Sequence, residues 1–409
     1  FSLKLCIILF YISIVPWYGI QIYLKMISAK KEKRNIKTYN TDAEEGSMSA
    51  GKIFSDRLIR FHKGMNRADL CNEMFCDVRE FRKESMNILK IIGRGAFCEV
   101  NQVYHTESDD FYAIKRPQQR LLCDLNHIPG EILADLALET AILATLSHEN
   151  IITLHGIKDG DVVQSLKKNN FFIVLELLVE TLHDRLTRWN GKYQRTHYNT
   201  TFFNIMRIID EGEVIRRLED IAMGIVKGMK YLHSKRIIHR DLKPKNVGFD
   251  ELHNKVKIFD FDLSREYVES KQQWVDSAPD LNQIRLMTTG VGTPRYMAPE
   301  MLMHETSYGF PVDVYSFGIL LWQLVTNRIP FKSISSPIQF AIKVSKGRRR
   351  PCLQYVKCKE LRNLMKACWT TNPDNRPSFS SIEQTLKSII DQYYSTIGIL
   401  GILTGAPPV

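Results

Sequence analysis

Two short polar segments carry residue types that phosphoryl transfer requires. One ends at Asn246 and reads His-Arg-Asp-Leu-Lys-Pro-Lys-Asn, and the other, an Asp-Phe-Asp run, begins at Asp260 after an apolar strand-like stretch. The reaction needs a carboxylate that orients the accepting hydroxyl and takes its proton, and oxygen ligands for Mg²⁺ beside the phosphates. Asp241 fits the first role, Asn246 and Asp260 fit the second, and Lys243 adds positive charge. A surface loop is the alternative, which the agreement of so many positions disfavours.

A glycine-rich hairpin lies upstream of these segments. Residues 93–100 read Gly-Arg-Gly-Ala-Phe-Cys-Glu-Val and separate two runs of strand-forming residues. Gly93 and Gly95 let the backbone fold closely over phosphates and present N–H groups to them. An ordinary turn would use the same residues. The segment is neither a Walker A loop nor a dinucleotide fingerprint, because no Gly-Lys-Ser/Thr follows and a strand comes next.

A lysine and a glutamate complete the candidate phosphate site. In the strand-like run 111–115, alternation places Ala113 and Lys115 on the face beneath the glycine hairpin. Glu139 lies on the apolar stripe of a predicted helix, where an unpaired carboxylate is costly to bury. We therefore expect Lys115 and Glu139 to form an ion pair. The alternatives are a lysine that reaches to solvent and a glutamate at the edge of the stripe.

The elements that position these residues change in type along the chain. Short strand-like runs come first, and amphipathic or wholly apolar helical stretches follow. We predict an α+β fold with a small β-rich lobe that holds one helix, a larger mainly helical lobe, and a cleft between them. The predicted strands are 87–92, 99–104, 111–115 and 171–176, and the predicted helices are 131–146, 214–232 and 312–325.

Composition supports a globular chain with a large core. It has 409 residues, of which 44% are hydrophobic and 25% charged, which excludes a disordered tail, a fibre and a disulfide-stapled mini-protein. Its 8 cysteines are scattered, which favours a reducing compartment and gives no zinc motif. The net charge of +11 is partly local to residues 25–37, so we expect no nucleic-acid partner.

Segments outside the predicted core have simpler interpretations. Residues 5–24 form a long apolar run followed by basic residues, a candidate membrane anchor that would leave the rest in the cytoplasm; a signal peptide, a buried segment or an artefact are the alternatives. The rest of 1–86 reads as a basic stretch and a linker. We predict the compact domain at 87–393, a polar surface loop at 186–213, and an apolar tail at 394–409 after the last helix.

The motifs together resemble those of eukaryotic protein kinases, over residues 87–393. Residues 292–300 resemble the family's Ala-Pro-Glu segment, Asp313 its buried helix aspartate, and Arg376 the arginine that pairs with Glu300. The resemblance implies ATP and Mg²⁺ as cofactors. It implies these roles: Lys115 and Glu139 position phosphates, Asp241 is the catalytic base, Lys243 stabilises transferring charge, and Asn246 and Asp260 bind the metal.

The resemblance also implies specificity and an adenine site. Lys243 and Thr293 follow the serine/threonine pattern, and the segment around Trp369 resembles tyrosine kinases, a mixture found in the tyrosine-kinase-like group. Leu175 occupies the gatekeeper position. The implied nucleotide-binding residues are Ile92, Gly93, Gly95, Val100, Ala113, Lys115, Glu176 and Leu178. Partners would be proteins that offer Ser or Thr hydroxyls.

Some residues indicate how the activity is regulated, and two others differ from the family's motifs. Arg240 directly precedes Asp241, as in kinases that are activated by phosphorylation. Thr288 or Thr289 is the expected phosphorylation site, modified by an upstream kinase or by self-phosphorylation. Cys98 replaces a loop glycine and is either an inert packed thiol or a redox-sensitive one. Asp262 replaces the glycine of the family's Asp-Phe-Gly motif and could bind metal or repel phosphate. A catalytically weak pseudokinase scaffold is therefore the alternative function.

Overall fold

The computed structural model describes residues 78–95, 98–118, 130–167, 170–196, 209–267, 294–302, 308–334, 336–347 and 349–404. The candidate anchor at 5–24, the linker before residue 78, and the expected phosphosites Thr288 and Thr289 lie outside these ranges. Among the described residues, no helix combines the length and the apolar character needed to cross a membrane.

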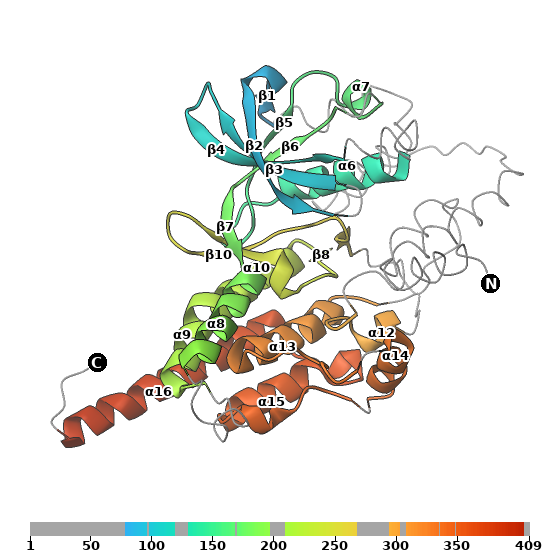
Figure 1. Cartoon of the computed structure of the whole chain (residues 1–409). Helices are drawn as coiled ribbons and strands as arrows, with labels where there is room; N and C mark the ends of the chain where they lie inside the picture. Colours follow the sequence, from blue (N-terminus) through green and yellow to red (C-terminus); the bar gives the residue numbers. More distant parts are fainter. Residues whose placement is uncertain are drawn as a thin grey trace, which may run out of the picture. The chain divides into compact units, whose positions relative to one another are not determined.

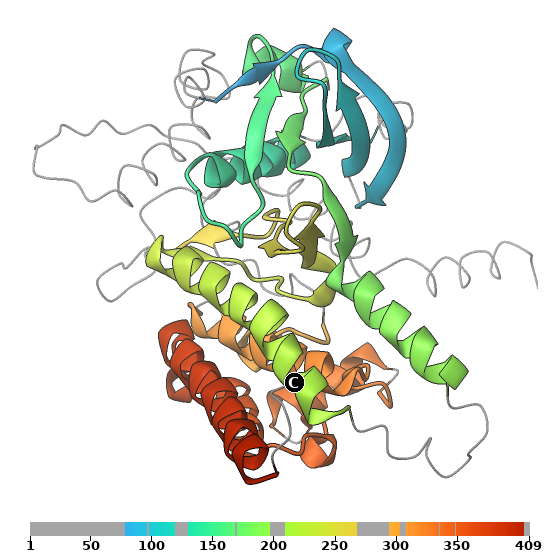
Figure 2. The same ribbon diagram turned by 90° about the vertical axis from the view of Figure 1, so that its left-hand side faces the viewer.

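A β-rich lobe comes first, as predicted, and α6 lies beside its sheet, on the side of the helical lobe (Figures 1 and 2). Its sheet has the order β1-β5-β6-β4-β3-β2, antiparallel except for the β1–β5 pair. The strands are β1 (Glu80–Phe81), β2 (Met86–Arg94), β3 (Cys98–His105), β4 (Asp110–Pro117), β5 (Leu154–Lys158) and β6 (Ile173–Leu175), and the helices are α6 (Gly130–Ala144) and α7 (Val162–Lys167). Burial alternates along β3, which explains why strand periodicity predicted it.

The compact domain begins earlier than the predicted residue 87. Strand β1 pairs Glu80 with Ile157 of β5, and the Phe81 side chain is 1% exposed. Its ring makes edge contacts with the rings of His105 and Tyr112, at centroid distances of 5.0 and 5.7 Å. One aromatic residue in a polar stretch gives no periodicity, so the sequence pattern missed this strand.

Gly156 on β5 is required by this close approach of β1. A Cβ atom at residue 156 would lie 2.2 Å from the carbonyl oxygen of Arg79 and 2.5 Å from Cε2 of Phe81. We expect Gly156→Ala to lower the free energy of unfolding by about 1–3 kcal/mol, because backbone must shift to make room. Denaturant melts should show a lowered midpoint. The control is Gly93→Ala, whose Cβ would meet Val100 at 3.6 Å; an equal effect of the two variants would contradict the packing argument.

The second lobe is mainly helical, as predicted. Its longer helices are α8 (Leu182–Thr196), α10 (Met223–Ser234), α13 (Pro311–Thr326), α14 (Pro337–Ser345), α15 (Lys359–Cys368) and α16 (Phe379–Thr404). Its short elements are α9 (Glu211–Arg217), α12 (Pro299–Leu302), β7 (Leu178–Thr181), β8 (Ile237–Ile238), β9 (Val247–Asp250), β10 (Val256–Ile258) and β11 (Arg265–Glu266). Its single 3₁₀ turns are Pro244–Asn246, Leu353–Tyr355 and Pro373–Asn375, and one in the β-rich lobe, Lys83–Ser85, lies between β1 and β2. The α+β assignment is confirmed.

Two helices of this lobe match the predicted periodicity closely. The amphipathic stretch 214–232 is helical throughout, with a π-helical segment, Leu218–Ala222, between α9 and α10. Helix α13 is buried along its whole length, begins with Pro311, and ends at Asn327 in the left-handed region (φ 51°). This buried helix carries Asp313, so the core itself fixes the position of that carboxylate.

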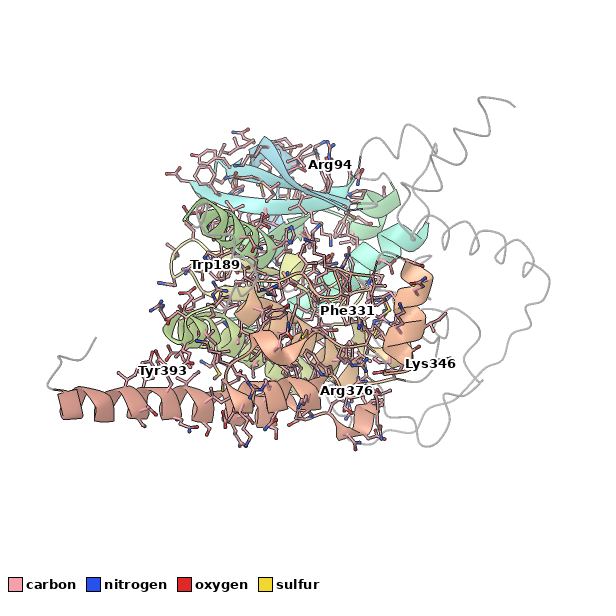
Figure 3. The ribbon with its side chains drawn as sticks, turned by 60° about the horizontal axis from the view of Figure 1, so that its bottom comes forward. Arg94, Trp189, Phe331, Lys346, Arg376 and Tyr393 are labelled. Carbon is pink, nitrogen blue, oxygen red and sulfur yellow. The ribbon has the colours of Figure 1, made fainter. Side chains whose placement is uncertain are left out.

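The structure corrects two predictions for this lobe. The expected surface loop at 186–213 is helical up to Thr196, because Leu182 and Leu186 are buried one turn apart and Trp189 packs on the same core. The expected tail after the last helix is also wrong up to Thr404, because α16 continues through it. Figures 1 and 3 show this helix extending past its neighbours.

Candidate active site

Lys115 is surrounded by three carboxylates. Its Nζ lies 2.7 Å from Glu139 Oε2 and 2.6 Å from Asp262 Oδ1. Asp260 Oδ1 is farther from Nζ, at 3.4 Å. Lys115 comes from β4 and Glu139 from α6, whereas the two aspartates follow β10, so the cluster joins both lobes. The expected pair of Lys115 with Glu139 is present, and Asp262 is a further partner that sequence reasoning missed.

Burial and proximity shift the pKa values within this cluster. Burial lowers the pKa of Lys115, but Asp262, Glu139 and Asp260 outweigh that effect and raise it well above its ordinary value. Burial raises the pKa of Glu139 well above its usual range, and the charge of Asp262 adds to the rise. Burial acts on Asp262 in the same sense, but Lys115 and hydrogen bonds overcome it and lower that pKa. Lys115 and Asp262 therefore form a fully charged pair.

Asp241 lies at the centre of a short loop. Its Oδ2 accepts hydrogen bonds from Lys243 Nζ at 2.5 Å and from Asn246 Nδ2 at 3.1 Å. Asn246 Nδ2 also donates to the Asp241 carbonyl oxygen at 3.0 Å, and Pro244 begins a 3₁₀ turn between the two residues. One carboxylate oxygen is thus held in place by two donors. The arrangement leaves Asp241 able to accept a hydroxyl proton, as its predicted role requires.

Asp313 anchors this loop through hydrogen bonds to its backbone. Its carboxylate is 0% exposed and accepts hydrogen bonds from the backbone N–H groups of His239 and Arg240, at 2.9 and 2.8 Å. The His233 ring nitrogen Nε2 lies 3.0 Å from the same carboxylate. Burial would raise the pKa of Asp313, but the interactions with His233 and His239 lower it, so it is held as a carboxylate. The buried helix therefore orients the two residues that precede Asp241.

The donor set around Asp260 fits a divalent cation. Burial raises the pKa of Asp260; Lys115 opposes the rise, and the charges of Asp262 and Asp241 increase it. The Phe259 N–H donates to the Asn246 carbonyl oxygen at 3.0 Å, which ties the predicted ligands Asn246 and Asp260 to one place. Oxygen ligands and a surplus of negative charge are what Mg²⁺ prefers.

Both Arg240 (φ 69°) and Asp260 (φ 67°) have left-handed backbones.

The described part of the glycine hairpin is closed by a side chain that the sequence did not single out. The Gly95 N–H donates to the Cys98 carbonyl oxygen at 2.8 Å. Gln118 Nε2, on a residue only 1% exposed, donates to the Gly95 carbonyl oxygen at 2.6 Å and to that of Cys98 at 3.3 Å. Gln118 directly follows β4, so it links the hairpin to the strand that carries Lys115. A single buried glutamine after a strand gives no recognisable pattern in the sequence.

Cys98 is expected to be chemically inert. Burial raises the pKa of its thiol to about 12, although Lys115 partly opposes the rise. The thiolate is the reactive form, and at pH 8 its fraction would be on the order of 10⁻⁴. We expect iodoacetamide to label the exposed Cys352 at least about tenfold faster than Cys98, measured by peptide mass spectrometry, with unfolded protein as the control. Comparable rates in the native protein would support the redox-sensitive alternative.

The predicted adenine-site residues come from both sides of the connection between the lobes. Ala113 pairs with Leu175, the expected gatekeeper, across β4 and β6. In β2 and β3, Gly93 pairs with Val100, next to the exposed Ile92, and Leu178 begins β7.

Glu176 has a side-chain role that the sequence did not reveal. Its carboxylate lies 3.0 Å from Lys257 Nζ and accepts a hydrogen bond from the Thr153 N–H at 3.2 Å. Lys257 is a charged residue within the apolar strand β10, which is the one signal that could have found it. This pair links the connection between the lobes to the strand that leads to Asp260.

Comparisons with known proteins agree with this geometry. A family model described as the protein kinase domain matches residues 86–388. The serine/threonine-protein kinase STY17 of Arabidopsis thaliana is 28% identical over 315 residues, which are 77% of this chain and 46% of that protein. A probable serine/threonine-protein kinase of Dictyostelium discoideum is 40% identical over 193 residues, 47% of this chain and 13% of that protein. The serine/threonine/tyrosine-protein kinase HT1 of Arabidopsis thaliana is 41% identical over 168 residues, 41% of this chain and 38% of its own length. The chain thus spans less than half the length of these relatives.

Proposed function

The chain belongs to the protein kinase family, and from this membership we propose that it transfers the γ-phosphoryl group of Mg-ATP to serine or threonine hydroxyls of protein substrates. The proposal rests on one observation: two clusters of polar side chains, one from each lobe, lie next to each other. Asp241, held by Lys243 and Asn246, belongs to the helical lobe, and the Lys115–Glu139 pair belongs to the β-rich lobe. Asp260 connects the two clusters. It lies beside Lys115, and it is close enough to Asp241 for the charge of Asp241 to raise the pKa of Asp260.

Each side chain has a defined task in this proposal. Asp241 orients the substrate hydroxyl and accepts its proton as the new oxygen–phosphorus bond forms and the bond to the leaving ADP oxygen breaks. Lys243 offsets the charge that develops on the transferred group. Lys115, positioned by Glu139, binds nucleotide phosphates. Asn246 and Asp260 would hold Mg²⁺, which supplies charge neutralisation at the phosphates when it is bound.

The choice of hydroxyl rests on Lys243 and on the names of the relatives. The Nζ atom of Lys243 lies 2.5 Å from Asp241 Oδ2. Its positive charge would therefore lie beside the substrate hydroxyl oxygen that Asp241 orients. STY17 is named a serine/threonine kinase, and HT1 a serine/threonine/tyrosine kinase. We propose Ser and Thr as acceptors, and activation by phosphorylation of Thr288 or Thr289 by an upstream kinase or by the chain itself.

Phosphate transfer from radiolabelled ATP tests the function. The full chain, with Mg²⁺ and a basic protein rich in Ser and Thr, should yield labelled phosphoserine or phosphothreonine, and a chelator of Mg²⁺ should abolish the transfer. Labelled phosphotyrosine alone would overturn the hydroxyl choice. ATP binding without any transfer, even after treatment with an activating kinase, would favour the pseudokinase scaffold.

A further inference from the structure

The ammonium group of Lys115 is enclosed by carboxylates. A lysine ammonium carries three N–H donors. Three carboxylate oxygens lie within 3.4 Å of this Nζ, and the nearest, at 2.6 Å, belongs to Asp262. Nζ donates hydrogen bonds to Asp262 and Asp260, and Glu139 Oε2 is an ion-pair neighbour without a hydrogen bond, so an incoming phosphate oxygen competes with carboxylates for this ammonium group.

The three carboxylates differ in how easily they can leave. Glu139 is 2% exposed, and its second oxygen accepts a hydrogen bond from the Phe261 N–H at 3.3 Å, so it is held from two directions. Asp260 is the proposed metal ligand and needs to stay near the phosphates. The side chain of Asp262 is 42% exposed, the largest value of the three. Asp262 is thus the group whose place a phosphate would take.

The backbone of Asp262 is held while its side chain is able to turn. Its carbonyl oxygen accepts a hydrogen bond from Arg265 Nη1 at 3.2 Å. Its φ angle is not in the left-handed region, so an aspartate at this position does not carry the backbone strain of that region. A rotation of the side chain alone can therefore release Lys115, without movement of the chain around Asp260.

We propose that Asp262 is an intramolecular competitor of nucleotide phosphate for Lys115, and that it weakens ATP binding by acting through that lysine. The inference rests on the proposed function, since it concerns the same phosphate site. The Asp262 carboxylate presents to Lys115 the kind of anionic oxygen that a phosphate presents, and after displacement it remains a negative charge beside the bound nucleotide. Both effects lower affinity for phosphates and neither acts on the base or the sugar.

Nucleotide affinity in an isosteric variant tests the inference. In Asp262→Asn of the full chain, the Kd for ATP in the presence of Mg²⁺, measured by calorimetry, should fall by about tenfold, the size expected for loss of one charged competitor. The Kd for adenosine should not change, because adenosine has no phosphate. Asp262→Gly should behave in the same way. In a Lys115→Met background, Asp262→Asn should change ATP affinity much less, because the shared partner is gone.

The outcomes separate this inference from the function itself. Unchanged or weaker ATP binding by Asp262→Asn would overturn the competitor role, and weaker binding would instead show that Asp262 assists the nucleotide. An equal gain for adenosine, or a full gain in the Lys115→Met background, would also overturn it. If the unaltered chain binds neither ATP nor adenosine, the proposed function fails as well.

Discussion

Replacement of Asp241 by asparagine is expected to lower kcat for phosphoryl transfer by about 10²–10⁴-fold, the range for loss of a general base. The amide is nearly isosteric but cannot accept a proton. Its amide oxygen can still accept the hydrogen bonds from Lys243 and Asn246, which hold the carboxylate at 2.5 and 3.1 Å, so the loop should keep its form. The KM for ATP should change little, because Lys115, Glu139 and the glycine hairpin are the residues expected to bind the nucleotide phosphates. Steady-state kinetics with labelled ATP would separate the two constants.

A control distinguishes chemistry from folding in this experiment. Asp391→Asn makes the same chemical change at an exposed position of α16 and should leave kcat unaltered. Thermal unfolding of both variants checks that each is folded. If Asp241→Asn kept kcat within a few-fold of the unaltered chain, Asp241 would not be the base.

The second large effect concerns the buried pair of Arg376, which is labelled in Figure 3, and Glu300 in the helical lobe. The guanidinium bonds both carboxylate oxygens, at 2.6 and 2.9 Å, and the two side chains are 0% and 4% exposed. Arg376→Met leaves Glu300 as a buried charge without its partner, so we expect the free energy of unfolding to fall by about 3–5 kcal/mol. Such a loss is a large share of the roughly 5–15 kcal/mol that stabilises a typical domain. Urea denaturation would measure it as a shift of the midpoint.

An ion pair with an exposed lysine in the same lobe provides the comparison. Lys387 lies 3.0 Å from Glu383 one helical turn away, and the lysine side chain is 58% exposed. Lys387→Met should cost only about 0.3–0.5 kcal/mol. A loss below about 1 kcal/mol for Arg376→Met would show that the buried charge of Glu300 finds another partner or a proton.

Residue spacing predicted the β-rich and helical lobes and the pairing of Lys115 with Glu139, because periodicity and polar spacing are local properties. The stripe of α6 that places Glu139 inward, and the buried run of α13, could be read from the sequence. The strand around Phe81 and the helical turns after Leu186 could not, because their burial depends on distant partners. The contacts of Gln118, Lys257 and Asp262 were missed for the same reason: each joins segments far apart in the chain.

The left-handed backbones of Arg240 and Asp260 have a consequence for protein engineering. Such a conformation in a residue with a side chain costs about 1–3 kcal/mol, and glycine adopts it without that cost. A library of variants screened only for heat resistance would therefore enrich glycine or asparagine at position 260, whereas the buried hydrogen bonds of Arg240 to Leu263 and Tyr308 oppose the change at position 240. The same library screened for phosphoryl transfer would reject them at Asp260, so the two screens should give opposite results there.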